Sequence, residues 1–282
     1  MIFPLLPLLL VGAVLAQSPQ ATPQAESHWV AVRTTGSEAS AITADEVQAK
    51  VDGRAIDIKS AVAQREKDPL LLGVVLDFSH SSRDELNERN NFAESLIYAL
   101  VRQGLDAGFV TLFDTEFDIS KVFRNPEEMI KRIRAGRSGG GTALFDAIFN
   151  SCLYIHDVQR QPRPGWVLLV FSDGDDNRSN KTSEEAIHRC QDSGTAIFSF
   201  VPNGDSPDRG GRVMKSMASA TGGEMYFGYS KKSEPKVAAH LTEVLRTTTL
   251  LELSPPVVQV RGKLELRFKT KQKAEILAPS VF

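Results

Sequence analysis

Two carboxylates and three hydroxyls stand at spacings that could bring them to one point. Asp77, Ser79 and Ser81 come at the end of the apolar run LLLGVVLDFS, and Asp173 follows the run WVLLVF. Because alternate side chains of an extended backbone share a side, Asp77, Ser79 and Ser81 are expected to point the same way. Thr142 opens a predicted helix between those two runs.

This set offers only oxygen ligands, the donor type that hard divalent cations such as Mg²⁺ prefer in proteins. Mn²⁺ suits the same donors, and Ca²⁺ is a further candidate. No histidine or thiolate is placed for a zinc site. The glycines at 139–141 let the backbone before Thr142 approach closely. Because Mg²⁺ tends to keep water, one coordination position would stay open, and an acidic group from outside could fill it.

The surrounding elements predict an α/β fold. Between about 70 and 248, apolar runs typical of strands covered on both faces alternate with segments whose apolar residues recur every three or four positions. The runs are LLLGVVLDFS, GFVTLFDT, WVLLVFSDG, TAIFSFVP and EMYFGY, and helix starts are expected near Leu86, Asn125, Leu144 and Ser233. This order favours a doubly wound, mostly parallel sheet. In such sheets ligands bind beyond the carboxyl ends of strands, where the strand order reverses.

The two flanks favour β-structure. Residues 28–34 and 47–59 have the pattern of short strands, and Asp52-Gly53 is a typical two-residue hairpin turn. After Pro255-Pro256, the segments VVQVRG and LELRFKT alternate with a period of two. We therefore expect the flanks, 28–66 and 250–282, to form one small β-module beside the sheet, with 17–27 as a linker.

Residues 1–16, MIFPLLPLLLVGAVLA, are apolar but too short to span a bilayer well, and small residues stand at 14 and 16. We expect a removable signal peptide, a mature chain from Gln17 and a secreted or periplasmic location, with no transmembrane segment after signal removal. The 33 basic and 35 acidic residues give a formal charge of −2 without a basic stripe, which argues against a nucleic-acid partner.

Two cysteines, Cys152 and Cys190, are expected on the inward faces of neighbouring helices. They form either two buried thiols or one disulfide. Two thiols are the simpler interpretation, and the sequence does not distinguish the two alternatives. Four further carboxylates near the expected site, at positions 114, 118, 175 and 176, could hold a second ion. Solvated loop charge is the simpler interpretation.

The chain resembles von Willebrand factor type A (VWA) domains at their metal-ion-dependent adhesion site (MIDAS). The resemblance is carried by the order Asp77-x-Ser79-x-Ser81, then Thr142, then Asp173 in SDG. The resemblance covers roughly residues 68–249, and the segments GGTALFDAI and SDGDDN are similar to those of exported bacterial members. It implies a Rossmann-like sheet with one short antiparallel edge strand, here the FDISKVF segment.

The resemblance also implies a function. VWA domains of this type are non-catalytic modules that bind the Glu or Asp of a protein ligand through a magnesium or manganese ion. The five residues carry over as direct or water-mediated ligands. His80 departs from the family, which commonly has Gly between the two serines, and would narrow a partner's approach or change the affinity for the ion.

Other function classes stay open. A metal-dependent phosphohydrolase with a D-x-D signature would need an acid where Ser79 stands. A serine hydrolase would need a nucleophile elbow, G-x-S-x-G, and we expect no such string in this chain. If His80 blocks the cation site, the protein would instead be a metal-free structural scaffold of the cell envelope. In the plainest reading, the serines, Thr142 and Asp173 serve only turns and helix caps.

Overall fold

The computed structural model describes residues 28–35, 42–80, 85–159, 165–202, 209–228, 230–254, 263–269 and 275–277. The expected signal peptide at 1–16, the linker at 17–27 and the run VVQV at 257–260 lie outside these ranges. Within them, no helix combines the length and the apolar character needed to cross a membrane.

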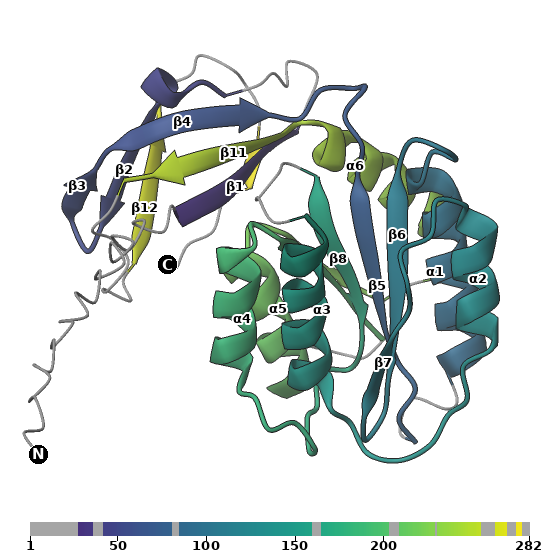
Figure 1. Cartoon of the computed structure of the whole chain (residues 1–282). Coiled ribbons are helices and arrows are strands. Elements are labelled where there is room, and N and C mark those ends of the chain that lie inside the picture. The colour runs from purple at the N-terminus through teal and green to yellow at the C-terminus, as the bar shows by residue number, and fades with distance from the viewer. Residues whose placement is uncertain are drawn as a thin grey trace, which may run out of the picture.

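A six-stranded sheet forms the centre of the molecule (Figure 1). Its strands are β5 (Leu71–Asp77), β6 (Ala107–Phe113), β7 (Phe117–Ile119), β8 (Trp166–Phe171), β9 (Ala196–Val201) and β10 (Met225–Phe227), in the order β10-β9-β8-β5-β6-β7. All neighbours are parallel except β6 and β7. The predicted doubly wound α/β fold with one short antiparallel edge strand is therefore confirmed. The strand order reverses between β5 and β8.

Helices cover both faces of this sheet (Figure 1). The helices α1 (Leu86–Leu100), α2 (Pro126–Arg134) and α6 (Glu234–Arg246) pack on one face, and α3 (Leu144–Gln159), α4 (Ser183–Asp192) and α5 (Arg209–Ala220) pack on the other. Local signals set several of the starts. The Asn125 side chain accepts a hydrogen bond from the backbone N–H of Glu127, and Thr182 forms a capping box with Glu185.

The flanks form two small antiparallel sheets. One contains β1 (His28–Thr35), β4 (Ile58–Ala63), β11 (Thr248–Leu253) and β13 (Glu275–Leu277), and the other contains β2 (Val47–Val51), β3 (Arg54–Ile56) and β12 (Leu264–Phe268). They share one apolar cluster, so together they make a single module. The hairpin turn between β2 and β3 falls at Asp52 and Gly53, both with positive φ (47° and 79°). Strand β11 straddles the expected boundary at residue 249.

The module lies beyond the N-terminal ends of the central strands, so it leaves their carboxyl ends clear (Figure 1). Arg33 of β1 is fully buried at this junction. Its Nη1 donates to the carbonyl of Gly222 at 2.6 Å, and its guanidinium lies 5.4 Å from the ring centroid of Phe198. Burial lowers the pKa of Arg33 to about 9.

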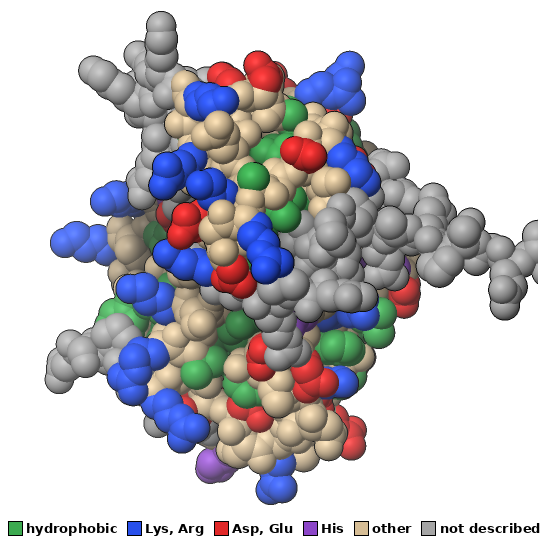
Figure 2. Space-filling model, turned by 90° about the vertical axis from the view of Figure 1, so that its left-hand side faces the viewer, with side chains coloured by type: hydrophobic (Ala, Val, Ile, Leu, Met, Phe, Trp, Pro, Cys, Tyr) green, Lys and Arg blue, Asp and Glu red, His purple; other side chains and the backbone are tan. Residues whose placement is uncertain are grey.

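Asp106, which precedes β6, forms a second buried polar cluster. Its carboxylate accepts hydrogen bonds from Arg102 and Arg246 and from the backbone N–H of Leu70. On the face shown in Figure 2, basic side chains lie mainly along the left of the view, and acidic ones lie at the top, in the middle and at the lower right. This face therefore carries both signs of charge.

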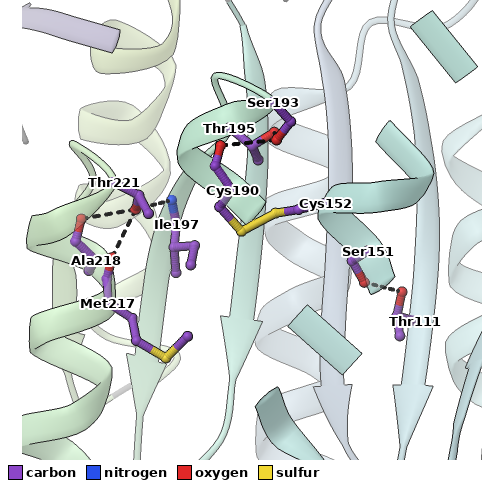
Figure 3. The surroundings of a disulfide bond; sticks show 10 residues. All are labelled: Thr111, Ser151, Cys152, Cys190, Ser193, Thr195, Ile197, Met217, Ala218 and Thr221. Carbon is purple, nitrogen blue, oxygen red and sulfur yellow. Dashed lines mark hydrogen bonds between the residues drawn. A yellow bond between two sulfur atoms is a disulfide. The ribbon is translucent and has the colours of Figure 1, made fainter. Parts of the chain in front are cut away.

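Cys152 of α3 and Cys190 of α4 are joined by a disulfide (Figure 3). Both residues are fully buried, and together they close a stretch with a sequence separation of 38. The simpler reading of two free thiols is thus wrong. The two helices pack side by side on one face of the sheet, and this packing brings the two cysteines together.

Candidate metal centre

Asp77 is the last residue of β5 and is 1% exposed. Its Oδ1 accepts the backbone N–H of Ser79 at 2.8 Å, and its Oδ2 accepts the hydroxyl of Ser172 at 2.9 Å. Burial raises the pKa of Asp77, while the hydrogen bonds from Ser79 and Ser172 act in the opposite direction. The carboxylate is therefore held in place by two neighbouring strands.

Asp173 lies one residue beyond Ser172, just after β8. Residues Leu76 and Phe171 are partners in the parallel pairing of β5 and β8, so the two carboxylates follow adjacent strands at the same edge. The chain then turns at Gly174, whose φ is +88°, and its N–H donates to Ser172 Oγ at 3.1 Å. Asp77 and Asp173 thus flank the point where the strand order reverses.

Thr142 is buried, with 3% of its surface exposed. Its backbone N–H donates to Asn177 Oδ1 at 3.0 Å. Its carbonyl accepts the N–H groups of Asn177 at 3.0 Å and Arg178 at 3.1 Å. These bonds tie the glycine-rich segment at 139–141 to the loop that follows β8.

The same glycine segment is also bonded to the loop that follows β5. The N–H of Gly139 donates to Phe78 O at 2.9 Å, and the N–H of His80 donates to Gly140 O at 3.3 Å. The side chain of His80 is exposed. Asp77, Ser79, Thr142 and Asp173 therefore lie on three loops that are bonded to one another. Ser81 lies outside the described residues.

Three residues that support this arrangement were missed at the sequence level. Arg89 of α1 is buried, donates to the carbonyl of Asp77 and lies 4.9 Å from the ring centroid of Phe78. Its position on the apolar face of a predicted helix was a usable signal. Ser172 and Asn177 carried no such signal, because their partners come from strands and loops far away in the sequence.

Three of the four other carboxylates near this edge have local roles, and the fourth, Asp175, is exposed. Asp176 Oδ2 accepts the N–H of Phe145 at 3.0 Å and the hydroxyl of Ser179 at 2.6 Å, so it caps the start of α3. Asp114 accepts the N–H of Glu116 at 3.1 Å, and Asp118 pairs with Arg132. No group of three or more His, Cys, Asp or Glu side chains suited to a metal occurs in the part of the chain that the structure describes.

The expectation that G-x-S-x-G is absent is wrong, because residues 136–140 read GRSGG. This string follows helix α2 instead of a strand, and the hydroxyl of Ser138 donates to the carbonyl of Ser79 at 3.2 Å. A nucleophile elbow requires a turn from a strand into a helix. The string therefore serves here to join the glycine segment to the loop after β5.

The chemistry of the donor set fits a hard divalent cation. Two carboxylates and the hydroxyls of Ser79 and Thr142 offer oxygen ligands only, which suits Mg²⁺, Mn²⁺ or Ca²⁺. Hydrogen bonds within the protein join the loops that carry these ligands. Such pre-organisation lowers the cost of ordering the ligands when a cation binds.

Comparison with known proteins relates this arrangement to a family. The model of "VWA domain containing CoxE-like protein" matches residues 34–223. No curated protein sequence matches the chain.

Solved structures share the fold. Proximal thread matrix protein 1 from the mussel byssus superposes with a TM-score of 0.54 at 15% identity, covering 69% of this chain and 50% of that one. A structure of the same mussel protein with a zinc-occupied MIDAS motif gives 0.52 at 16% identity, covering 69% and 49%. A von Willebrand factor type A protein from Catenulispora acidiphila gives 0.52 at 10% identity, covering 91% and 73%. The chain spans about half the length of the mussel protein.

Proposed function

The chain belongs to the family of VWA domain containing CoxE-like proteins, and from this membership we propose that it binds a protein partner through a divalent cation. The cation, Mg²⁺ or a similar hard ion, is held by Asp77, Ser79, Ser81, Thr142 and Asp173. The partner supplies the carboxylate of a Glu or Asp side chain to the remaining coordination position. The protein is non-catalytic and acts outside the cytoplasm.

The observation that carries this proposal is the contact between Ser172 Oγ and Asp77 Oδ2 at the reversal of strand order. This contact keeps the ends of β5 and β8 together, so that the carboxylates of Asp77 and Asp173 follow the same edge. Asn177 then holds the loop of Thr142 against that edge. These protein contacts position the oxygen ligands, and the cation, when bound, supplies a Lewis-acidic point for a carboxylate oxygen.

Two further observations support the ion and the location. The mussel protein of similar fold has been seen with zinc in its MIDAS motif, which supports a divalent cation here without fixing its identity. The disulfide between Cys152 and Cys190 supports an oxidising compartment, as does the apolar segment at 1–16.

The test is Mn²⁺ binding to the purified full chain, measured by electron paramagnetic resonance. Wild type should bind one Mn²⁺, and Thr142→Ala should weaken that binding at least about tenfold while keeping the metal-free melting temperature, because the backbone bonds of Thr142 remain. Asp175→Ala is the matched control, since Asp175 is exposed and lies two residues from Asp173. It should bind Mn²⁺ as wild type does.

Thermal melting gives an independent readout. A cation at a hundred times its dissociation constant adds about 2.7 kcal/mol of stability, or about 5 to 10 °C for a protein of this size. Absence of Mn²⁺ binding by wild type would reject the proposal. Phosphomonoester turnover that disappears with chelator would replace it with the phosphohydrolase reading.

A further inference from the structure

We propose that Arg178 and the cation together form a two-point site for the partner's carboxylate. One carboxylate oxygen binds the cation, and the other accepts hydrogen bonds from the Arg178 guanidinium. This inference rests on the proposed function and adds to it the residue that would orient the incoming acidic side chain.

The backbone of Arg178 is bonded to Thr142, and its side chain passes over Gly141. Its N–H donates to the carbonyl of Thr142 at 3.1 Å, so its backbone touches a proposed ligand residue. Its side chain lies against Gly141: a Cβ at Gly141 would stand 2.6 Å from Arg178 Cγ and 2.9 Å from its Nε, and also 2.6 Å from Asn177 Oδ1. A larger residue at 141 would therefore displace the Arg178 side chain from this position, and Gly141 directly precedes Thr142.

The guanidinium of Arg178 is available to a ligand. Arg178 is exposed, and among the described residues its side chain makes no ion pair or hydrogen bond. By contrast, Arg102, Arg132 and Arg134 each pair with a carboxylate of the chain.

Two acidic residues close to Arg178 in the sequence are engaged with other donors, and the exposed Asp175 forms no ion pair with it in the described part of the chain. Asp176 accepts hydrogen bonds from Phe145 and Ser179, and Asp173 accepts the N–H of Asp175 at 3.0 Å. Arg178 is thus a cation held at the proposed site without an internal counter-ion in the described part of the chain.

The chemistry of this pair selects a carboxylate. A guanidinium presents parallel N–H donors that match carboxylate oxygens, and hydrogen bonds between charged groups are stronger than neutral ones. Packing of the Arg178 stem on Gly141 restricts its motion before a ligand arrives, which reduces the entropy lost on binding. A neutral amide offers one acceptor and no charge, so it would gain little from Arg178.

The test uses acetate as the probe and acetamide as its neutral counterpart. Acetate is titrated into the Mn²⁺-loaded full chain, and its binding is followed through loss of the water-proton relaxation that Mn²⁺-bound water causes. Arg178→Ala should weaken acetate binding about tenfold, equivalent to ~1.4 kcal/mol. Mn²⁺ affinity should stay the same or rise, because a positive charge beside the cation has been removed.

Three variants complete the experiment. Arg178→Lys keeps the positive charge but lacks the paired N–H donors of the guanidinium, so its affinity for acetate should lie between those of wild type and Arg178→Ala. Gly141→Ala should weaken acetate binding because its Cβ displaces the Arg178 side chain. The same Cβ would lie 2.6 Å from Asn177 Oδ1, which accepts the N–H of Thr142, so the Mn²⁺ affinity of this variant is measured in parallel. Arg54→Ala is the charge control: Arg54 is exposed on β3 of the flank module, beyond the N-terminal ends of the central strands, so it should leave acetate binding unchanged.

The outcomes separate this inference from the proposed function. If Arg178→Ala binds both Mn²⁺ and acetate as wild type does, the role of Arg178 is rejected and the cation site stands. If acetate binds equally well after chelation, the two-point site is rejected, since the cation takes no part. If wild type binds no Mn²⁺, the proposed function itself fails.

Discussion

Reduction of the disulfide between Cys152 and Cys190 should destabilise the protein by a calculable amount. The bond closes a stretch with a sequence separation of 38. In the chain-entropy model, a loop of this length lowers the entropy of the unfolded chain by about 13 cal/mol/K, or about 4 kcal/mol at 25 °C. For a protein of this size that corresponds to a fall in melting temperature of about 8 °C or more.

The measurement is urea unfolding of the wild-type chain with and without a reductant such as TCEP. Reduction leaves both sulfur atoms in the core, so it isolates the cross-link from the packing of the side chains. The double variant Cys152→Ala, Cys190→Ala serves as the control, and its unfolding curve should not respond to reductant. The slope of free energy against urea should rise in the reduced protein, because its unfolded state exposes more surface.

Two results would refute this reasoning. Two titratable thiols per chain in the denatured, unreduced protein would show that the cross-link is absent. If complete reduction is verified and the free energy of unfolding changes by less than about 0.5 kcal/mol, the bond does not act through the unfolded chain.

Three further predictions concern stability. Burial is the largest single influence on the pKa of Asp106 and raises it, but the hydrogen bonds together lower the pKa from 3.8 to about 2. The ionised carboxylate therefore stabilises the fold by ~2 kcal/mol above about pH 4, and this contribution is lost as the pH falls toward 2. Asp106→Asn should flatten this pH dependence of the unfolding free energy in acid titrations. Gly53→Ala and Gly174→Ala form a matched pair, because both glycines have positive φ (79° and 88°). The added Cβ meets nothing within 4 Å at Gly53, but it meets a backbone oxygen at 2.2 Å at Gly174. By urea unfolding, Gly53→Ala should lower the free energy of unfolding by about 1 to 2 kcal/mol and Gly174→Ala by clearly more, and equal losses would contradict the close contact at Gly174. Ser172→Ala should cost about 1 to 3 kcal/mol and weaken Mn²⁺ binding by calorimetry, and unchanged values for both would argue against its contact with Asp77.

The secondary structure followed closely from local patterns. Continuous apolar runs became strands with both faces covered, and the segment from Leu86 to Leu100 became a helix with its apolar stripe on the sheet. The turn at Asp52-Gly53 took the positive φ values that its residue types favour. Each of these outcomes depends on residues within about one turn or one strand length of one another, which is why a single sequence was enough.

The candidate site was predictable only in part. The sequence placed Asp77 and Asp173 at the ends of apolar runs, but it held no information on whether β5 and β8 are neighbours. Strand order decided that, and the 2.9 Å contact of Ser172 with Asp77 followed from it. The packing of Arg178 on Gly141 likewise depends on the loop after β8 crossing the glycine segment.

By itself, the amino-acid sequence determined the α/β class, the starts of four of the helices, the apolar runs that form the central strands, and the types of side chain available to bind a cation. Only the tertiary structure decided that Cys152 and Cys190 are bonded, that Arg89 is buried beneath Asp77, and that Arg178 lies beside Thr142. The physical reason is range. Backbone preferences and hydrophobic periodicity act between residues near in the chain, whereas these contacts join residues 12 to 38 positions apart, and the packing of helices and strands on one sheet brings them together.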